Sequence, residues 1–91
     1  MNRYEVIIGD DNVEIGAESA EDAAAQARAL LASYAEQRFA ALGRAGQFIN
    51  VPEFTISAGI DTLGADGYAD YDTDEISVEI TVAVPADIYR A

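Results

Sequence analysis

The sequence contains no cysteine, no histidine and no lysine. The lack of cysteine excludes a disulfide framework, a thiolate zinc site, an iron–sulfur cluster and a thiol nucleophile. The lack of histidine removes the usual general base near neutral pH and the commonest ligand of transition metals. The lack of lysine excludes a Schiff base and a phosphate-loop lysine. These absences favour a binding protein over an enzyme, and they predict no metal and no cofactor.

Positive charge is also scarce, because five arginines face 17 acidic residues and the formal net charge is -12. Such a charge repels phosphate backbones and anionic lipids, which disfavours direct binding to nucleic acid or to a membrane surface. The acidity is uneven. Residues 1–44 carry eight acids and four arginines (net -4), whereas residues 45–91 carry nine acids and Arg90 alone (net -8). The second half of the chain is therefore the more acidic.

Long hydrophobic runs are absent as well: none approaches the roughly 18 residues of a membrane span. Met1-Asn2-Arg3 leads directly into a strand pattern and not into a signal peptide, so we expect a cytoplasmic protein. With 91 residues, of which 51% are hydrophobic, the chain is expected to form a single domain, residues 1–91.

Apolar residues alternate with polar ones in four segments, which predicts strands over about 3–8, 13–17, 54–60 and 75–84. Between the second and third strands, alanine-rich sequence predicts a helix over about 20–42. Ser19 is its expected N-cap, with Asp22 as the acidic partner of a capping box, and Gly43 is its expected stop. Gly9-Asp10-Asp11-Asn12 is expected to form the turn of the first hairpin.

The predicted order of strand, strand, helix, strand, strand (ββαββ) favours an α+β fold. We expect a two-layer sandwich, a four-stranded antiparallel sheet with the helix packed on its apolar face. The opposite face is expected to present mostly polar side chains to solvent: Glu5, Glu14, Thr55, Ser57, Ser77, Glu79 and Thr81.

The last two strands are joined by a long acidic connection, residues 61–74, in which Asp70, Asp72 and Asp74 recur every second residue. In an extended chain this spacing places carboxylates on one side at intervals of about 6.6 Å, similar to the spacing of phosphates along a nucleic-acid strand. An ordinary solvated surface explains such a run equally well. The functional interpretation is an acidic surface that binds a basic protein, through Asp61, Asp66, Tyr68, Asp70, Tyr71, Asp72, Asp74, Glu75 and Glu79.

Residues 70–75 invite comparison with a calcium loop. An EF-hand loop has glycine at its sixth position and glutamate at its twelfth, but here these positions hold Glu75 and Thr81. Weak calcium binding stays open as a minor alternative.

The segment from Val13 to Leu31 resembles the strand–cap–helix segment of small prokaryotic and phage proteins, including antitoxins of the HicB type. The whole chain, in its size, charge, strand–strand–helix start and acidic hairpin, resembles the anti-CRISPR proteins of phages and mobile elements. That resemblance implies a non-enzymatic DNA mimic that occupies the DNA path of a CRISPR surveillance complex in the cytoplasm of a bacterial host cell. The alternative is an antitoxin-like or phage accessory domain that binds its partner through an apolar edge or groove. In that case its acidity would serve solubility, and a homodimer is possible in either case.

Overall fold

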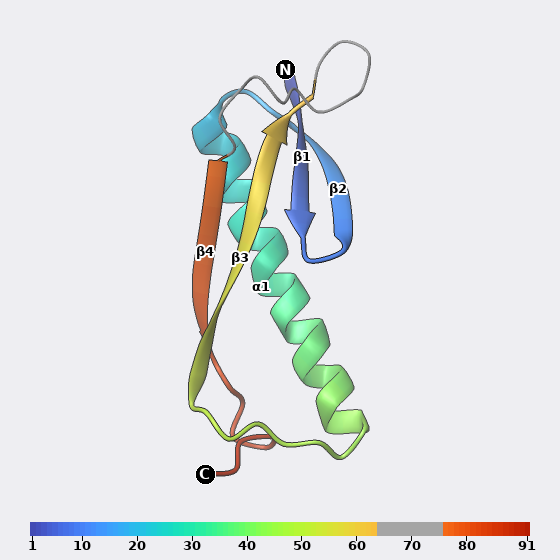
Figure 1. Cartoon of the computed structure of the whole chain (residues 1–91), viewed down its shortest axis with the longest axis vertical. Helices are drawn as coiled ribbons and strands as arrows, with labels where there is room; N and C mark the ends of the chain where they lie inside the picture. Colours follow the sequence, from blue (N-terminus) through green and yellow to red (C-terminus); the bar gives the residue numbers. More distant parts are fainter. Residues whose placement is uncertain (64–75) are drawn as a thin grey trace.

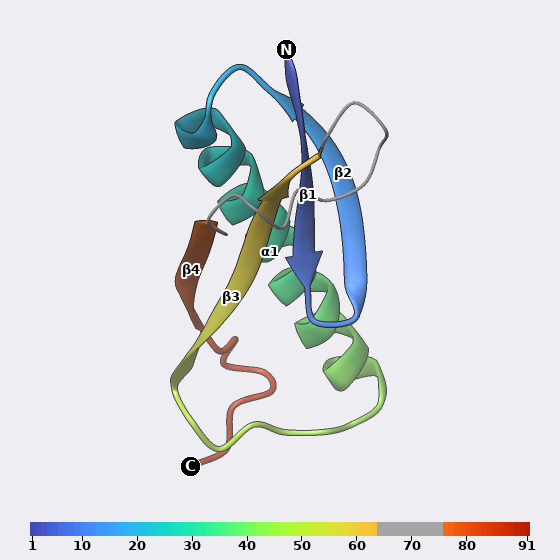
Figure 2. The ribbon, with the colours of Figure 1, turned by 45° about the horizontal axis from the view of Figure 1, so that its top comes forward.

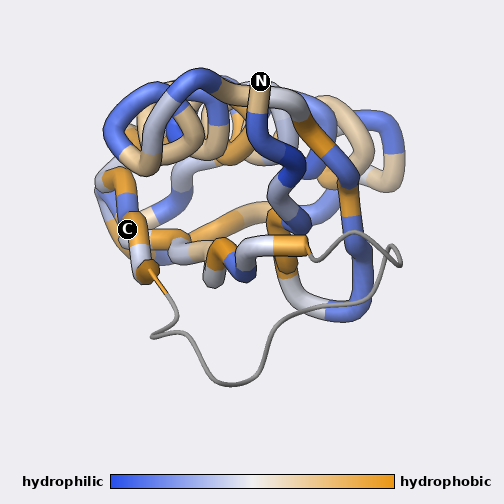
Figure 3. The backbone as a smooth tube through the Cα atoms, turned by 90° about the horizontal axis from the view of Figure 1, so that it is seen from above, coloured by the Kyte–Doolittle hydropathy of each residue, from blue (hydrophilic) through white to orange (hydrophobic). Residues whose placement is uncertain are grey.

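The computed structural model describes residues 1–63 and 76–91 and has the predicted α+β architecture. Four strands, β1 (Asn2–Ile8), β2 (Asp11–Ala17), β3 (Glu53–Thr62) and β4 (Ile76–Ala83), form an antiparallel sheet in the order β2-β1-β3-β4. The helix α1 (Ala20–Arg44) crosses one face of this sheet (Figure 1). Seen along its long axis, the molecule has a helix layer above a sheet layer (Figure 3).

The first hairpin turns more tightly than its sequence suggests. Ile8 pairs with Asp11, so the turn consists of Gly9 and Asp10 alone. Gly9 has a φ of 61°, while no residue other than glycine has a positive φ in the described chain. This is the pattern of a type II′ turn, which needs glycine at its first central position. The expectation that Asp11 and Asn12 also belong to the turn was wrong, because strand pairing continues through both.

The predicted helix start is confirmed. The Ser19 hydroxyl accepts a hydrogen bond from the backbone N–H of Asp22 at 3.1 Å, and the Asp22 carboxylate accepts one from the backbone N–H of Glu18 at 3.2 Å. These bonds satisfy two backbone donors at the helix start, and the acidic first turn lies favourably at the positive end of the helix dipole.

The predicted helix stop at Gly43 was wrong, since α1 continues to Arg44. Gly46, with a φ of 69°, adopts the left-handed conformation that ends the helix. The backbone N–H of Gln47 donates to the carbonyl of Leu42 at 2.9 Å, and that of Gly46 donates to the carbonyl of Gly43 at 3.1 Å. This pair of bonds is a Schellman motif.

In the described residues, α1 is not apolar enough along its length to cross a membrane.

The main core lies between the first half of α1 and the sheet. On the helix, the buried side chains recur every fourth residue, at Ala23, Ala27 and Leu31. The small side chains of Ala23 and Ala27 let α1 approach the strands closely. The sheet supplies the alternating apolar residues that the sequence predicted to point inward, and these members of the core are Tyr4, Val6, Ile8, Ala17, Ala58, Ile60 and Val78.

A second, smaller core lies beyond the first hairpin, at the C-terminal end of α1. It consists of Ala35, Phe39, Val84 and Ile88, with Phe54 packed edge-to-face on Phe39 at 5.4 Å between ring centroids. The prediction ended the last strand at Val84 and assigned no role to the residues after it. In the structure these residues return to the protein, because the backbone of Ile49 bonds to Ile88 and Arg90.

Val6 and Val13 offer a matched test of this packing, because they face each other across β1 and β2 but differ in burial. Val6 is fully buried and Val13 is 36% exposed. We expect Val6→Ala to lower the free energy of unfolding by about 2–3 kcal/mol, through lost burial plus a cavity, and Val13→Ala to lower it by less than about 1 kcal/mol. Urea unfolding measures both, and equal losses would contradict the assigned core.

Candidate protein-binding surfaces

The face of the sheet turned away from α1, called here the open face, carries most of the exposed polar side chains of the strands. The seven residues predicted to point outward are all exposed or half-buried in the structure. Strand register determines which of these side chains are neighbours, and this could not be known from the alternating pattern alone.

Three carboxylates lie side by side on the open face. Glu5 on β1 is directly opposite Glu14 on β2 and directly opposite Asp61 on β3. Residues that face each other across neighbouring strands have Cβ atoms about 4.5–5.5 Å apart, and like charges in such positions repel. We call Glu14, Glu5 and Asp61 the carboxylate row. It crosses β2, β1 and β3, three neighbouring strands of the sheet.

The row has a single neighbouring cation among the described residues. The Arg3 guanidinium donates to the Glu14 carboxylate, and both side chains are about half exposed. An exposed pair of this kind contributes about 0–1 kcal/mol. Because one arginine is paired with a row of three carboxylates, the row keeps an excess of negative charge on the open face.

Of the nine predicted partner-binding residues, Asp61 and Glu79 lie in the described part of the chain. Both are on the open face, but Glu79 is opposite Ser57, four residues along β3 from Asp61, and so it stands apart from the carboxylate row. The other seven predictions lie outside the described residues: Asp66, Tyr68, Asp70, Tyr71, Asp72, Asp74 and Glu75.

Sequence reasoning missed Glu5 and Glu14 as members of the acidic site. Both were predicted to face solvent, yet they lie in the less acidic half of the chain. They meet Asp61 because β1 is central and pairs with both β2 and β3. No signal within one strand reveals that arrangement. Residues 1–63 and 76–91 contain no cluster of three or more potential ligands arranged to hold a metal ion.

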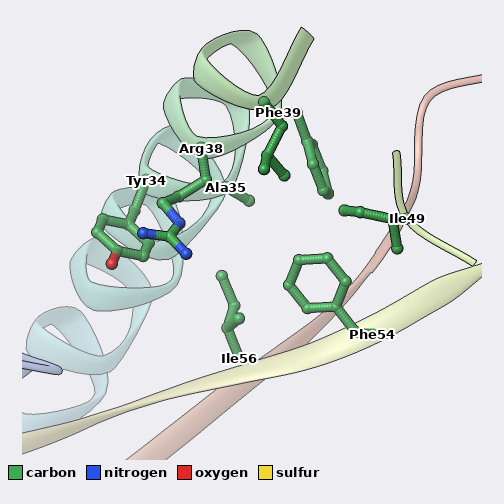
Figure 4. Close-up of a pocket in the computed structure, with 8 residues that line it drawn as sticks. Tyr34, Ala35, Arg38, Phe39, Ile49, Phe54 and Ile56 are labelled. Atoms are coloured by element: carbon green, nitrogen blue, oxygen red, sulfur yellow. The ribbon is translucent and has the colours of Figure 1, made fainter. Parts of the chain in front are cut away.

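A second candidate surface is an apolar pocket of about 310 Å³ between α1 and β3. Figure 4 shows that Tyr34, Arg38 and Phe39 approach it from the helix, while Phe54 and Ile56 approach it from β3. Its wall is completed by Ala35, Leu42 and Ile49. We call this cavity the β3 pocket. Ligand and side-chain pockets in proteins are commonly apolar with a few polar groups, as here.

Comparisons of the chain with protein-family models, with curated proteins and with solved structures found no match.

The carboxylate row can be tested through its repulsion. We expect Glu5→Gln to raise the free energy of unfolding at low salt by up to about 1 kcal/mol, because it removes the central of three facing charges. Glu79→Gln is the matched control, since Glu79 faces a serine. The difference between the variants should shrink in about 1 M salt, where the Debye length falls to about 3 Å. Equal effects of the two substitutions in low-salt urea unfolding would contradict the row.

Proposed function

We propose that this protein is a non-enzymatic inhibitor that binds the basic, nucleic-acid-binding surface of a bacterial protein in the cytoplasm and blocks access of DNA to it. The observation that carries the proposal is the carboxylate row, three facing carboxylates served by one arginine. Neighbouring strands lie about 4.8 Å apart, so the row is a dense line of negative charge on a rigid sheet.

Charge of this density suits a partner whose lysines and arginines normally hold phosphates. Complementary potentials increase the rate of encounter and determine register, and they exclude partners of the same charge. The net charge of -12 strengthens the attraction over the whole molecule. The likeness of the chain to anti-CRISPR proteins supports a CRISPR surveillance complex as the target.

A second candidate function is supported by the β3 pocket. An antitoxin-like or phage accessory domain would bury an apolar groove against its partner, and a cavity lined by Phe39, Phe54 and Ile56 offers one. Binding through this surface would depend weakly on salt, whereas binding through the carboxylate row would weaken as ionic strength rises. Salt dependence therefore separates the two candidates.

The proposal is tested with purified CRISPR surveillance complexes of several types and the fluorescence anisotropy of their labelled target DNA. The wild-type protein is expected to prevent DNA binding by at least one complex. The triple variant Glu5→Gln, Glu14→Gln, Asp61→Asn should need a concentration at least about tenfold higher, because three charge contacts are lost. The variant Asp70→Asn, Asp72→Asn, Asp74→Asn tests the acidic connection in the same assay.

The matched control is Glu18→Gln, Glu36→Gln, Asp87→Asn, which makes the same change of net charge at exposed positions away from the open face. It should inhibit nearly as well as the wild type. Equal losses of inhibition in the control and in the row variant would show that inhibition depends on net charge and not on the carboxylate row. Failure of the wild type to inhibit any complex would reject the CRISPR target. Capture of a partner that duplex DNA does not displace would favour the second candidate.

A further inference from the structure

The edge of β3 is only partly covered by its neighbour β1. The two strands pair from Tyr4–Thr62 to Ile7–Gly59, whereas β3 continues to Glu53 and pairs with β4 over that whole length. In the part of the chain that the structure describes, no strand pairs with the other side of residues 53–57. We call this stretch the lower β3 edge. An unpaired strand edge offers backbone N–H and C=O groups to an incoming strand.

The lower β3 edge exists because the elements differ in length. β1 and β2 have seven residues each and extend about 23 Å, whereas the ten residues of β3 extend about 33 Å and the 25 residues of α1 about 37 Å. In Figure 2 the first hairpin ends partway along the molecule, and α1 and β3 continue past its turn. The β3 pocket lies between these two continuing elements.

The pocket also has the right position for a side chain of an added strand. The inward side chains of β1 are Tyr4, Val6 and Ile8, and Val6 faces Ile60 on β3. Facing residues point to the same side of a sheet, and this alternation has a period of two. A strand that continued the line of β1 would therefore place its next inward side chain opposite Ile56, at the wall of the pocket.

Arg38 gives this site a charge preference. Its side chain lies beside Tyr34 on the helix side of the pocket (Figure 4), and it makes no ion pair with any residue that the structure describes. Its helical neighbours three and four residues away are Tyr34, Ala35, Ala41 and Leu42, none of which is acidic. A guanidinium beside an apolar cavity suits a ligand that carries both a carboxylate and an apolar group, even though the net charge of the protein is -12.

We propose that the lower β3 edge and the β3 pocket bind an extended peptide segment of a partner protein. The segment adds to the sheet antiparallel to β3 and places one apolar side chain in the pocket. An aspartate or glutamate two residues away in the segment, whose side chain points to the same side of the sheet, pairs with Arg38. In binding by strand addition, the backbone bonds supply affinity and the side-chain pocket supplies specificity. The inference rests on the second candidate function, because both use the β3 pocket. It is independent of the proposed inhibitor function, because it uses no residue of the carboxylate row.

The test begins with selection of displayed random peptides on the full-length protein. Counter-selection on the variant Arg38→Glu, which keeps the carboxylate row, removes basic peptides that bind the open face. The expected consensus combines an apolar residue with aspartate or glutamate. Anisotropy of the labelled consensus peptide should show that Arg38→Gln weakens binding at least about fivefold. Arg28→Gln, the same substitution at an exposed position of α1 outside the pocket, should change it less than about twofold.

Two further readouts separate strand addition from a simple charge contact. Bound peptide should slow amide hydrogen exchange within residues 53–57, and Arg38→Glu should bind a peptide in which lysine replaces the acidic residue. A consensus without an acidic residue, equal losses for Arg38→Gln and Arg28→Gln, or unchanged exchange in residues 53–57 would each overturn the proposal.

Discussion

The length of the first hairpin is the constraint on which the rest of the structure depends. A two-residue turn at Gly9 and Asp10 ends β1 after seven residues, so β1 covers only part of β3. Beside the hairpin, the sheet and the first half of α1 enclose the main core. Beyond its turn, α1 and β3 are joined by the C-terminal residues, which bring Val84 and Ile88 to a separate, smaller core. The β3 pocket lies where neither the hairpin nor the C-terminal residues reach.

Much of this fold was predictable from the sequence, because its signals are local. Alternation identified the strands and their buried faces, and Ser19 identified the helix start. The errors have equally local causes. Gly43 is tolerated inside α1, and the left-handed residue that stops the helix is Gly46. Asp11 and Asn12 are typical turn residues, but strand pairing includes them because glycine at the first turn position already suffices.

The candidate site was less predictable, because it depends on contacts between strands. The acidic residues of one hairpin could be listed from the sequence, yet Asp61 has its acidic neighbours on a different hairpin. Only strand order and register bring Glu5 and Glu14 to it. The same holds for the pocket, since apolar residues along the helix sequence indicate only a face that packs against the sheet. Nothing in the helix sequence shows that β1 ends too early to cover the β3 pocket.

The division of the interior into two cores also affects how the protein opens. Ile56 packs against both cores, while the second, smaller core has four buried side chains among the described residues and draws two of them, Val84 and Ile88, from the last eight residues of the chain. Regions with few buried apolar contacts open at lower free energy than the rest of a protein. The C-terminal end is therefore expected to detach in brief local unfolding events while the upper half of the sheet stays folded. Such events would expose Phe39 and Phe54 without loss of the carboxylate row. A rise in temperature would therefore disturb the β3 pocket more than the open face.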